Sequence, residues 1–454
     1  MPPDLPKLNR RAFAIGGLAA TAHRASAQTS APTGAPRVVL EARPADIRLR
    51  PGAAKFTSAW TYNGLCPGPI IRVRQGDDLR VRLVNRLDEE TTIHFCGVRN
   101  RSEMDGAAGL SQRPVTPGDS FDYQVATRDA GTFLYRSGAH GRIAEQCERG
   151  LYGLLIIDER QPPPVDKDLS ALIDDWRLDE NSAYVELPRE LNGSLPRVGN
   201  LLTVNGERRV YEENVPVGGR ARLRLINAAA ARIMTLKFEG SAPTIVAIDG
   251  QPSSTAFKPK GSAVIMTPGG RLDLMVDLPG EAGEEFKVLA QLSPEVTVPI
   301  MLLRSVGNRR AALPPVRALP QNDLPEKLDL ARSQRVELVI EGGPSPVGSQ
   351  KPWTLNGRGA GGVYSGKPLF TAKRGATLTL SFVNRTSIAH AMHVHGHHGR
   401  LLFSLDDGWD PFWVDTVLVQ PGRTARFAFV ADNPGKWTLG SAMAELFDAN
   451  LGGW

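Results

Sequence analysis

Apolar and polar residues alternate along many short segments of this chain. Clear cases are residues 79–84, 220–226 and 377–383, each bounded by Gly, Pro or Asn. Alternation with a period of two indicates strands with one buried and one solvated face, and frequent turns between such strands are typical of β-sandwiches. Helical periodicity is confined to a short segment at 143–149. We therefore predict an all-β fold with one short helix.

One phrase of strand residues followed by Asn-Gly occurs three times, at 60–64, 202–206 and 353–357. Each copy is followed by an alternating strand that ends in an apolar-Asn pair, and later by a Pro-Gly turn that opens another strand. Ordered markers that recur at a period of about 150 residues indicate a triplicated domain. We place the three domains at 37–160, 165–305 and 335–454, with a Pro-rich linker at 306–334.

The composition is that of a folded protein. Of the 454 residues, 41% are hydrophobic and 22% are charged, which excludes wholesale disorder. There is no apolar run of the length that a membrane-spanning helix needs, so we expect no membrane span. The formal net charge is +6, but the basic residues are scattered singly through alternating segments, which is typical of solvated strand faces. We therefore expect no nucleic-acid partner.

The N-terminus has the pattern of an export signal. Arg10-Arg11 precedes a mildly apolar stretch at 14–22 and an Ala-Ser-Ala motif that ends at Ala27, which is typical of a twin-arginine signal peptide spanning 1–27. Cleavage near Ala27 would remove four of the 54 basic and one of the 48 acidic residues and leave a net charge of +3. We expect the twin-arginine translocation machinery as a partner and a periplasmic location.

Histidines are concentrated at one place in the chain. Five of the eight lie in the segment 390–398, where His393 and His395 are two residues apart and would share one face of a strand. His94 and Cys96 form a second pair with the same spacing. Such converging donors suit copper or zinc. A polar surface strand is the alternative for the first group, and satisfied core residues are the alternative for the second.

The three cysteines are Cys66, Cys96 and Cys147. An odd number in an exported chain leaves one thiol unpaired after any single disulfide. Three pairings are possible, among them Cys66 with Cys147, which would leave Cys96 free.

The order of these segments resembles that of the three-domain multicopper oxidases, and the resemblance covers nearly the whole chain after the leader. It is carried by the phrase at 60–64, by Thr92-Ile93-His94-Phe95-Cys96-Gly97, by the segments 130–138 and 150–153, and by His390-Ala391-Met392-His393-Val394-His395-Gly396-His397. The resemblance implies three cupredoxin-like Greek-key β-sandwich domains and copper as the cofactor.

The resemblance also implies a set of copper ligands that this chain keeps only in part. At the family's second His-x-His motif the chain has Arg136 and Gly138. At the family's His-Cys-His triplet it has Gly440-Ser441-Ala442, and Leu446 stands where a later His should be. The type 1 copper site would keep only His390, and a serine hydroxyl cannot supply the thiolate that gives that site its electron-transfer character.

By the same correspondence, His94 and His393 stand at the two type 2 copper positions, and His395 and Cys96 belong to the neighbouring type 3 pair. These side chains would meet between the first and third domains and offer three imidazoles and one thiolate, a donor set suited to one copper or zinc ion. The alternative is that they are relics in a metal-free protein, with Cys96 a small buried apolar group. Asp105 stands where the family has an acidic group that assists proton delivery to dioxygen, although an Asp-Gly turn explains it equally.

Two functions follow from these residues. The first is an exported metal-binding member of the family with one copper or zinc ion and weak or altered oxidoreductase activity. In the family, electrons enter at the type 1 copper and leave at the trinuclear cluster, and both sites are incomplete here. Efficient laccase-type turnover is therefore not expected. The second is a non-enzymatic periplasmic scaffold without copper, similar to copper-free relatives that stabilise bacterial cell division. Its partners would then be envelope or cell-division proteins. We expect a monomer in either case.

Overall fold

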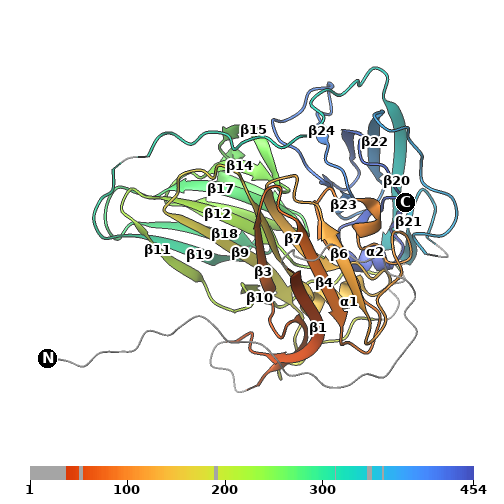
Figure 1. Ribbon diagram of the computed structural model, residues 1–454, viewed down its shortest axis with the longest axis horizontal. Coiled ribbons are helices and arrows are strands. Elements are labelled where there is room, and N and C mark those ends of the chain that lie inside the picture. Colours follow the sequence, from red (N-terminus) through yellow and green to blue (C-terminus); the bar gives the residue numbers. More distant parts are fainter. Residues whose placement is uncertain (1–36, 51–54, 189–192, 312, 345–349, 360–361) are drawn as a thin grey trace. The chain divides into compact units, whose positions relative to one another are not determined.

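The computed structural model describes residues 37–50, 55–188, 193–311, 313–344, 350–359 and 362–454. The predicted signal peptide at 1–27 lies outside the described residues. Strands dominate the described chain, which confirms the all-β prediction (Figure 1). They form six sheets. These sheets pair into three sandwiches, because the apolar side chains of each pair pack into one shared core.

The first sandwich has sheets with strand orders β2-β1-β4-β6 and β3-β8-β7-β5. Its strands are β1 (Arg37–Ile47), β2 (Thr57–Tyr62), β3 (Gly68–Arg74), β4 (Leu79–Asn85), β5 (Ile93–Cys96), β6 (Ser120–Val125), β7 (Gly131–Ser137) and β8 (Tyr152–Asp158). In β4, buried and half-buried residues alternate, as the sequence pattern predicts. Val81 from the first sheet and Phe133 from the second belong to the same core.

The second sandwich has sheets with strand orders β10-β9-β12-β17-β14-β15 and β11-β19-β18-β13-β16. Its strands are β9 (Lys167–Trp176), β10 (Leu201–Val204), β11 (Tyr211–Pro216), β12 (Arg220–Asn227), β13 (Met234–Glu239), β14 (Thr244–Ile248), β15 (Gln251–Phe257), β16 (Ala263–Met266), β17 (Arg271–Asp277), β18 (Glu285–Gln291) and β19 (Thr297–Val306). Leu223 of the first sheet and Val288 of the second lie in their common core.

The third sandwich has sheets with strand orders β21-β20-β22-β26-β24 and β25-β23-β27-β28. Its strands are β20 (Gln334–Pro344), β21 (Gln350–Leu355), β22 (Thr377–Asn384), β23 (His390–Val394), β24 (Arg400–Leu402), β25 (Thr416–Val419), β26 (Thr424–Val430), β27 (Leu439–Ser441) and β28 (Gly452–Gly453). Strand β23 lies between β25 and β27 and is buried along its whole length, so the histidine-rich segment runs through the interior.

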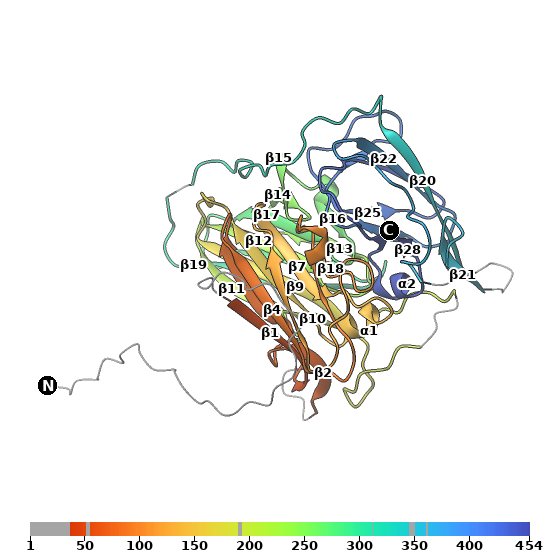
Figure 2. The same cartoon turned by 45° about the vertical axis from the view of Figure 1, so that its right-hand side comes forward.

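Helices are few and short. The described residues contain α1 (Ile143–Glu148), α2 (Ala444–Asp448) and the 3-10 turns Ser102–Met104 and Lys260–Ser262. Helix α1 lies where the sequence predicts one, and it contacts α2 (Figure 2). The Asp448 carboxylate accepts hydrogen bonds from the backbone N–H groups of Gly141 and Ala144 at 2.7 and 2.8 Å. The end of α2 therefore holds the start of α1 and joins the first sandwich to the third.

The repeated Asn-Gly phrase has one conformation in all three sandwiches. Asn63, Asn205 and Asn356 have positive φ angles of 59°, 52° and 52°. In each copy the Asn side-chain oxygen accepts a hydrogen bond from a backbone N–H of the preceding strand, and its amide donates to a carbonyl two residues earlier in that strand. Because Asn and Gly tolerate left-handed backbone, this local chemistry accounts for the recurrence of the phrase.

Strand β12 departs from the expectation that basic residues on alternating segments are solvated. All of its residues are buried. Arg222 donates to Glu159 and Asp273, and Arg224 donates to Asp168, at distances of 2.7–2.8 Å. The prediction that these basic residues face solvent is wrong here. The second face of β12 is covered by carboxylates from the first sandwich and from β9 and β17 rather than by water. Buried charges need such partners.

Candidate metal centre

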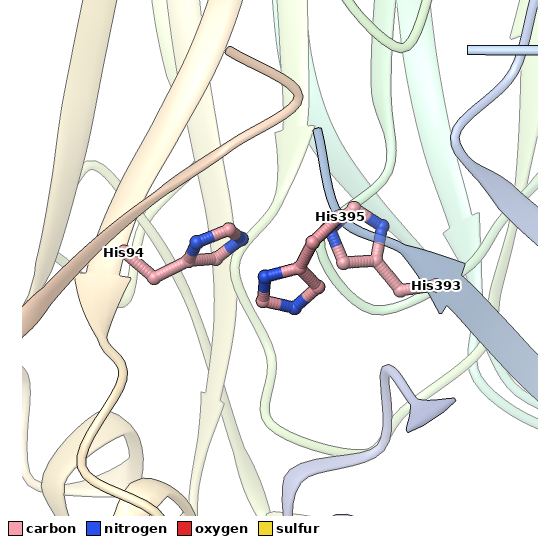
Figure 3. Close-up of side chains that lie close together, drawn as sticks. All are labelled: His94, His393 and His395. Atoms are coloured by element: carbon pink, nitrogen blue, oxygen red, sulfur yellow. The ribbon is translucent and has the colours of Figure 1, made fainter. Parts of the chain in front are cut away.

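Three histidines of the first and third sandwiches converge. His94 lies on β5, His393 lies on β23, and His395 follows directly after β23. One ring nitrogen from each lies within 4.8 Å of the others. The ring of His94 stacks on His395 with centroids 3.9 Å apart, and it meets His393 edge-on at 5.7 Å. Figure 3 shows His94 facing the other two rings from the opposite side of the centre. The predicted meeting of the two strand pairs is thus present for these three side chains, which we call the histidine triad.

Hydrogen bonds hold the Nδ1 atoms of the triad. Nδ1 of His94 lies 2.8 Å from the carbonyl oxygen of Asp105, and Nδ1 of His395 lies 2.8 Å from the carboxylate of the same Asp105. Nδ1 of His393 lies 3.0 Å from the hydroxyl of Thr416 and 3.2 Å from the carbonyl oxygen of Asp415. Partners of this kind fix the orientation of metal-binding imidazoles and direct Nε2 toward the ion.

The opposite ring nitrogens of two triad members lack partners. Nε2 of His94 and Nε2 of His393 are buried and accept or donate no hydrogen bond within the described chain. An unpaired buried polar atom is costly, so two of them on neighbouring imidazole rings call for an occupant. Copper and zinc both accept imidazole nitrogen, and the donor set therefore fits one such ion.

Asp105 bridges two members of the triad. Burial alone would raise the pKa of this carboxyl, but His395 and His94 lower it well below the usual range, so the group is ionised. Burial lowers the pKa of His94, yet Cys96 and Asp105 outweigh burial and raise it to about 10. Asp105 is followed by Gly106, which has a φ of 83° and packs against the carbonyl of Ile93. Asp105 therefore both begins an Asp-Gly turn and contacts the triad, so the two explanations of this residue are compatible.

A buried ion cluster lies behind His393. The Asp415 carboxylate contacts His393 Nδ1 at 3.3 Å and pairs with the guanidinium of Arg271. Arg271, on β17 of the second sandwich, is fully buried and also lies 3.7 Å from Asp249. Burial would raise the pKa of Asp415, but Arg271 and His393 lower it well below its usual range. Sequence reasoning missed Arg271, because nothing local links β17 to a histidine more than 100 residues away.

Cys96 lies beside the triad but outside it. The group of mutually close metal-binding atoms contains the three histidines and not the Cys96 sulfur. Cys96 belongs to an apolar cluster with Leu134 and Ile226, and its thiol also interacts with His94 and Arg136 through hydrogen bonds. Burial raises the pKa of its thiol, but His94 and then Arg136 outweigh burial and lower it to about 6. All three cysteines are unpaired, so the Cys66–Cys147 disulfide is not formed in the structure.

The triad lines a cavity of about 30 Å³ that also borders Arg136, Gly138 and Ser441. Gly138 and Gly440 leave no room for larger side chains on this backbone. A Cβ at position 138 would collide with the carbonyl oxygen of Gly106, and a Cβ at position 440 would lie 2.6 Å from the ring of Phe447. The space beside these two glycines is therefore filled by backbone and by an aromatic ring.

His390 is not brought to the triad. It is fully buried, its Nε2 lies 2.9 Å from the hydroxyl of Thr386, and its ring lies edge-on to Trp353. Its Nδ1 has no hydrogen-bond partner among the residues that the structure describes. Burial lowers the pKa of His390 to about 4. Leu446 is fully buried in the apolar core of the same sandwich.

Comparison with known proteins shows the family of the chain. Two family models, both described as multicopper oxidase, match residues 46–162 and 329–453. A multicopper oxidase of known structure from Pseudomonas thermotolerans is 34% identical, with 92% of this chain and 98% of that chain covered and a TM-score of 0.79. Lac15, from a marine microbial metagenome, is 32% identical, with coverage of 90% and 97% and a TM-score of 0.74.

The curated protein MmcO of Mycobacterium tuberculosis, a multicopper oxidase, is 27% identical over 94% of this chain and 88% of its own length. The chain belongs to the multicopper oxidase family, and the prediction of three cupredoxin-like sandwiches is confirmed. Among the described residues, no helix has both the length and the apolar character needed to cross a bilayer.

Proposed function

We propose that this protein binds one copper or zinc ion at the histidine triad, His94, His393 and His395, and acts as a one-metal member of the multicopper oxidase family. The observation that carries the proposal is the pair of buried, unpartnered Nε2 atoms of His94 and His393. Their Nδ1 atoms are already held by the protein, so both rings are oriented before an ion arrives.

The full copper set of the family does not fit the residues present. At the type 1 position, Ser441 and Leu446 replace a thiolate and an imidazole, and only His390 remains. At the cluster position, Arg136 brings a positive charge where the family has a ligand, and Gly138 and Gly440 have no space for a side chain. Three imidazoles serve one ion, and the cavity of about 30 Å³ has room for one ion and a small further ligand.

A bound copper ion would supply one-electron redox chemistry, and a bound zinc ion would supply a Lewis acid. The residues of this chain have separable tasks. His94 and His393 offer Nε2 as donors, and Asp105 keeps His94 and His395 in orientation through hydrogen bonds to both rings. Asp105 is thus a positioning residue.

We also propose that the leader directs the folded protein to the periplasm through the twin-arginine machinery. A metal site loaded before export would be retained there.

The test is the copper and zinc content of the mature protein, measured by mass spectrometry after expression with each metal. The wild type should carry about one ion per chain, and the His94→Ala/His393→Ala double variant should carry none. The control is His140→Ala, because His140 lies outside the triad and packs on Tyr364 and Phe447. Its metal content should equal that of the wild type.

Metal-free wild type in both media would overturn the proposal. The alternative, a non-enzymatic envelope or cell-division scaffold, would then be the function to pursue. Circular dichroism of the double variant separates loss of the ion from loss of the fold.

A further inference from the structure

Arg271 lies where the three sandwiches meet behind the histidine triad. It is the first residue of β17 in the second sandwich, and it pairs with Asp415, which directly precedes β25 in the third. Gly97 directly follows β5 of the first sandwich, and a Cβ there would collide with the Arg271 guanidinium and the Asp415 carboxylate. The second sandwich supplies no member of the triad, but it reaches the centre through this buried ion pair.

The two terminal nitrogens of Arg271 have partners that suit a guanidinium. Nη1 donates to the carbonyl of Gly269 at 2.8 Å and to Oδ1 of Asp415 at 3.3 Å. Nη2 donates to the carbonyl of Asp249 at 2.8 Å and to Oδ2 of Asp415. Each terminal nitrogen has two N–H groups, so all four are used in a planar, two-pronged contact with the carboxylate. A lysine ammonium has three donors on one atom and cannot reproduce this arrangement.

The clamped carboxylate sets the hydrogen bonds of His393. A carboxylate only accepts, so the Thr416 hydroxyl, 2.8 Å from Oδ1 of Asp415, donates its proton there. The same hydroxyl oxygen therefore accepts from Nδ1–H of His393 at 3.0 Å, and the Asp415 carbonyl at 3.2 Å can also only accept. Nδ1 of His393 thus carries the proton and Nε2 keeps its lone pair, which is the tautomer that a metal ion needs.

We propose that Arg271 is a positioning residue for the metal centre. By clamping the Asp415 carboxylate it holds His393 in the tautomer and orientation that bind an ion, so metal binding depends on contact with the second sandwich. This role rests on the proposed function and specifies how the same site is regulated by the packing of the three sandwiches.

The test compares Arg271→Lys with the matched control Arg222→Lys. Both arginines are buried and pair with carboxylates, and Arg222 pairs with Asp273 on the same strand β17, so each substitution keeps the charge and disturbs a buried ion pair. Affinity for Co²⁺ is measured by chelator competition, and the visible spectrum of bound Co²⁺ reports on its ligands. Arg271→Lys should weaken Co²⁺ binding about 10-fold and alter the spectrum, because His393 is no longer held. Arg222→Lys should leave both unchanged.

A second variant, Asp415→Asn, breaks the pair from the other side. If Arg271 acts through Asp415, the losses of Co²⁺ affinity in Arg271→Lys and Asp415→Asn should be less than additive in the double variant. Additive losses would overturn the proposal, and so would a wild-type affinity and spectrum in Arg271→Lys. An equal loss in Arg222→Lys would also overturn it, because general loosening between the sandwiches would then be the cause. Circular dichroism of each variant checks that it is folded.

A metal-free measurement separates this role from the proposed function. In protein with ¹⁵N-labelled histidine, the ring signals of His393, assigned by their loss in His393→Gln, report its tautomer by NMR. The wild type and Arg222→Lys should show the Nδ1–H form, and Arg271→Lys a mixture of both forms. If the protein binds no metal but shows this pattern, the proposed function fails and the positioning of His393 by Arg271 stands. If it binds metal but Arg271→Lys changes neither the tautomer nor the Co²⁺ affinity, the function stands and the positioning role fails.

Discussion

Glu445 gives a sharp test of the electrostatics near the join of the first and third sandwiches. It lies on α2, is 6% exposed, and accepts a hydrogen bond from the backbone N–H of Arg197 at 2.7 Å. Burial, reinforced by Glu148, raises the pKa of Glu445 to about 7, compared with 4.5 for an ordinary glutamate. Because the folded state holds the proton of Glu445 more tightly than the unfolded state, the contribution of this residue to stability is fully present below pH 4.5. It is lost as the pH rises to about 7.

The size of this loss follows from the two pKa values. At 1.36 kcal/mol per pH unit, the difference between 4.5 and about 7 corresponds to about 3 kcal/mol. Glu445→Gln keeps the acceptor oxygen for Arg197 and removes the titration. The variant should match the wild type at pH 4.5 and exceed its free energy of unfolding by up to about 3 kcal/mol at pH 8.

Urea unfolding at pH 4.5 and pH 8, followed by tryptophan fluorescence, measures this difference. The control is Glu326→Gln, an exposed glutamate in the segment between β19 and β20, whose effect should stay within about 0.5 kcal/mol at both pH values. The reasoning is refuted if Glu445→Gln changes stability equally at the two pH values, or if it is less stable than the wild type at pH 8. Either result would mean that the ionised carboxylate is compensated by its surroundings.

Two further predictions concern the turn that carries Asp105. Asp105→Asn should weaken metal binding on the order of 10- to 100-fold in a chelator competition titration. His395 loses the carboxylate bonded to its Nδ1, and His94 loses the negative charge 3.3 Å from its Nδ1; unchanged affinity would contradict this role. Gly106→Ala should lower stability by about 1–3 kcal/mol more than Gly118→Ala in denaturant unfolding. Both glycines have positive φ, but a Cβ at Gly106 collides with the Ile93 carbonyl, whereas Gly118 faces open space; equal losses would refute the steric argument.

The fold was predictable because its signals are local. Alternation along 79–84 and 377–383 predicts strands with one covered face. The Asn-Gly phrase repeats because its turn needs left-handed backbone and a side chain that forms hydrogen bonds with the preceding strand. Strand β12 shows the limit of such reasoning. Its arginines are interior because Glu159 and Asp273 lie against them, and partners so distant in sequence leave no trace in the local pattern.

The candidate site was predictable in its donors but not in its surroundings. Spacing of two residues on strands is enough to place His393 and His395 near each other, and the family resemblance pairs them with His94. The same spacing suggested Cys96 as a fourth donor, yet its sulfur is not among the mutually close metal-binding atoms. The residue belongs to an apolar interface with Leu134 and Ile226, where all of β5 is buried. That interface depends on the second sandwich, which spacing along β5 cannot reveal.

Arg136 shows why the changes at the family's copper-ligand positions should be considered together rather than one by one. From the sequence it is a missing ligand, and a missing ligand suggests only decay. In the structure it is a cation that borders the same cavity as the histidine triad and forms a hydrogen bond with the Cys96 thiol. A relic that had merely lost its metal would be expected to fill the cavity with apolar atoms, since burying polar and charged groups is costly. Retained donors with unpartnered Nε2 atoms on His94 and His393 are the pattern of a centre that still binds an ion, and the metal content of the His94→Ala/His393→Ala variant tests this.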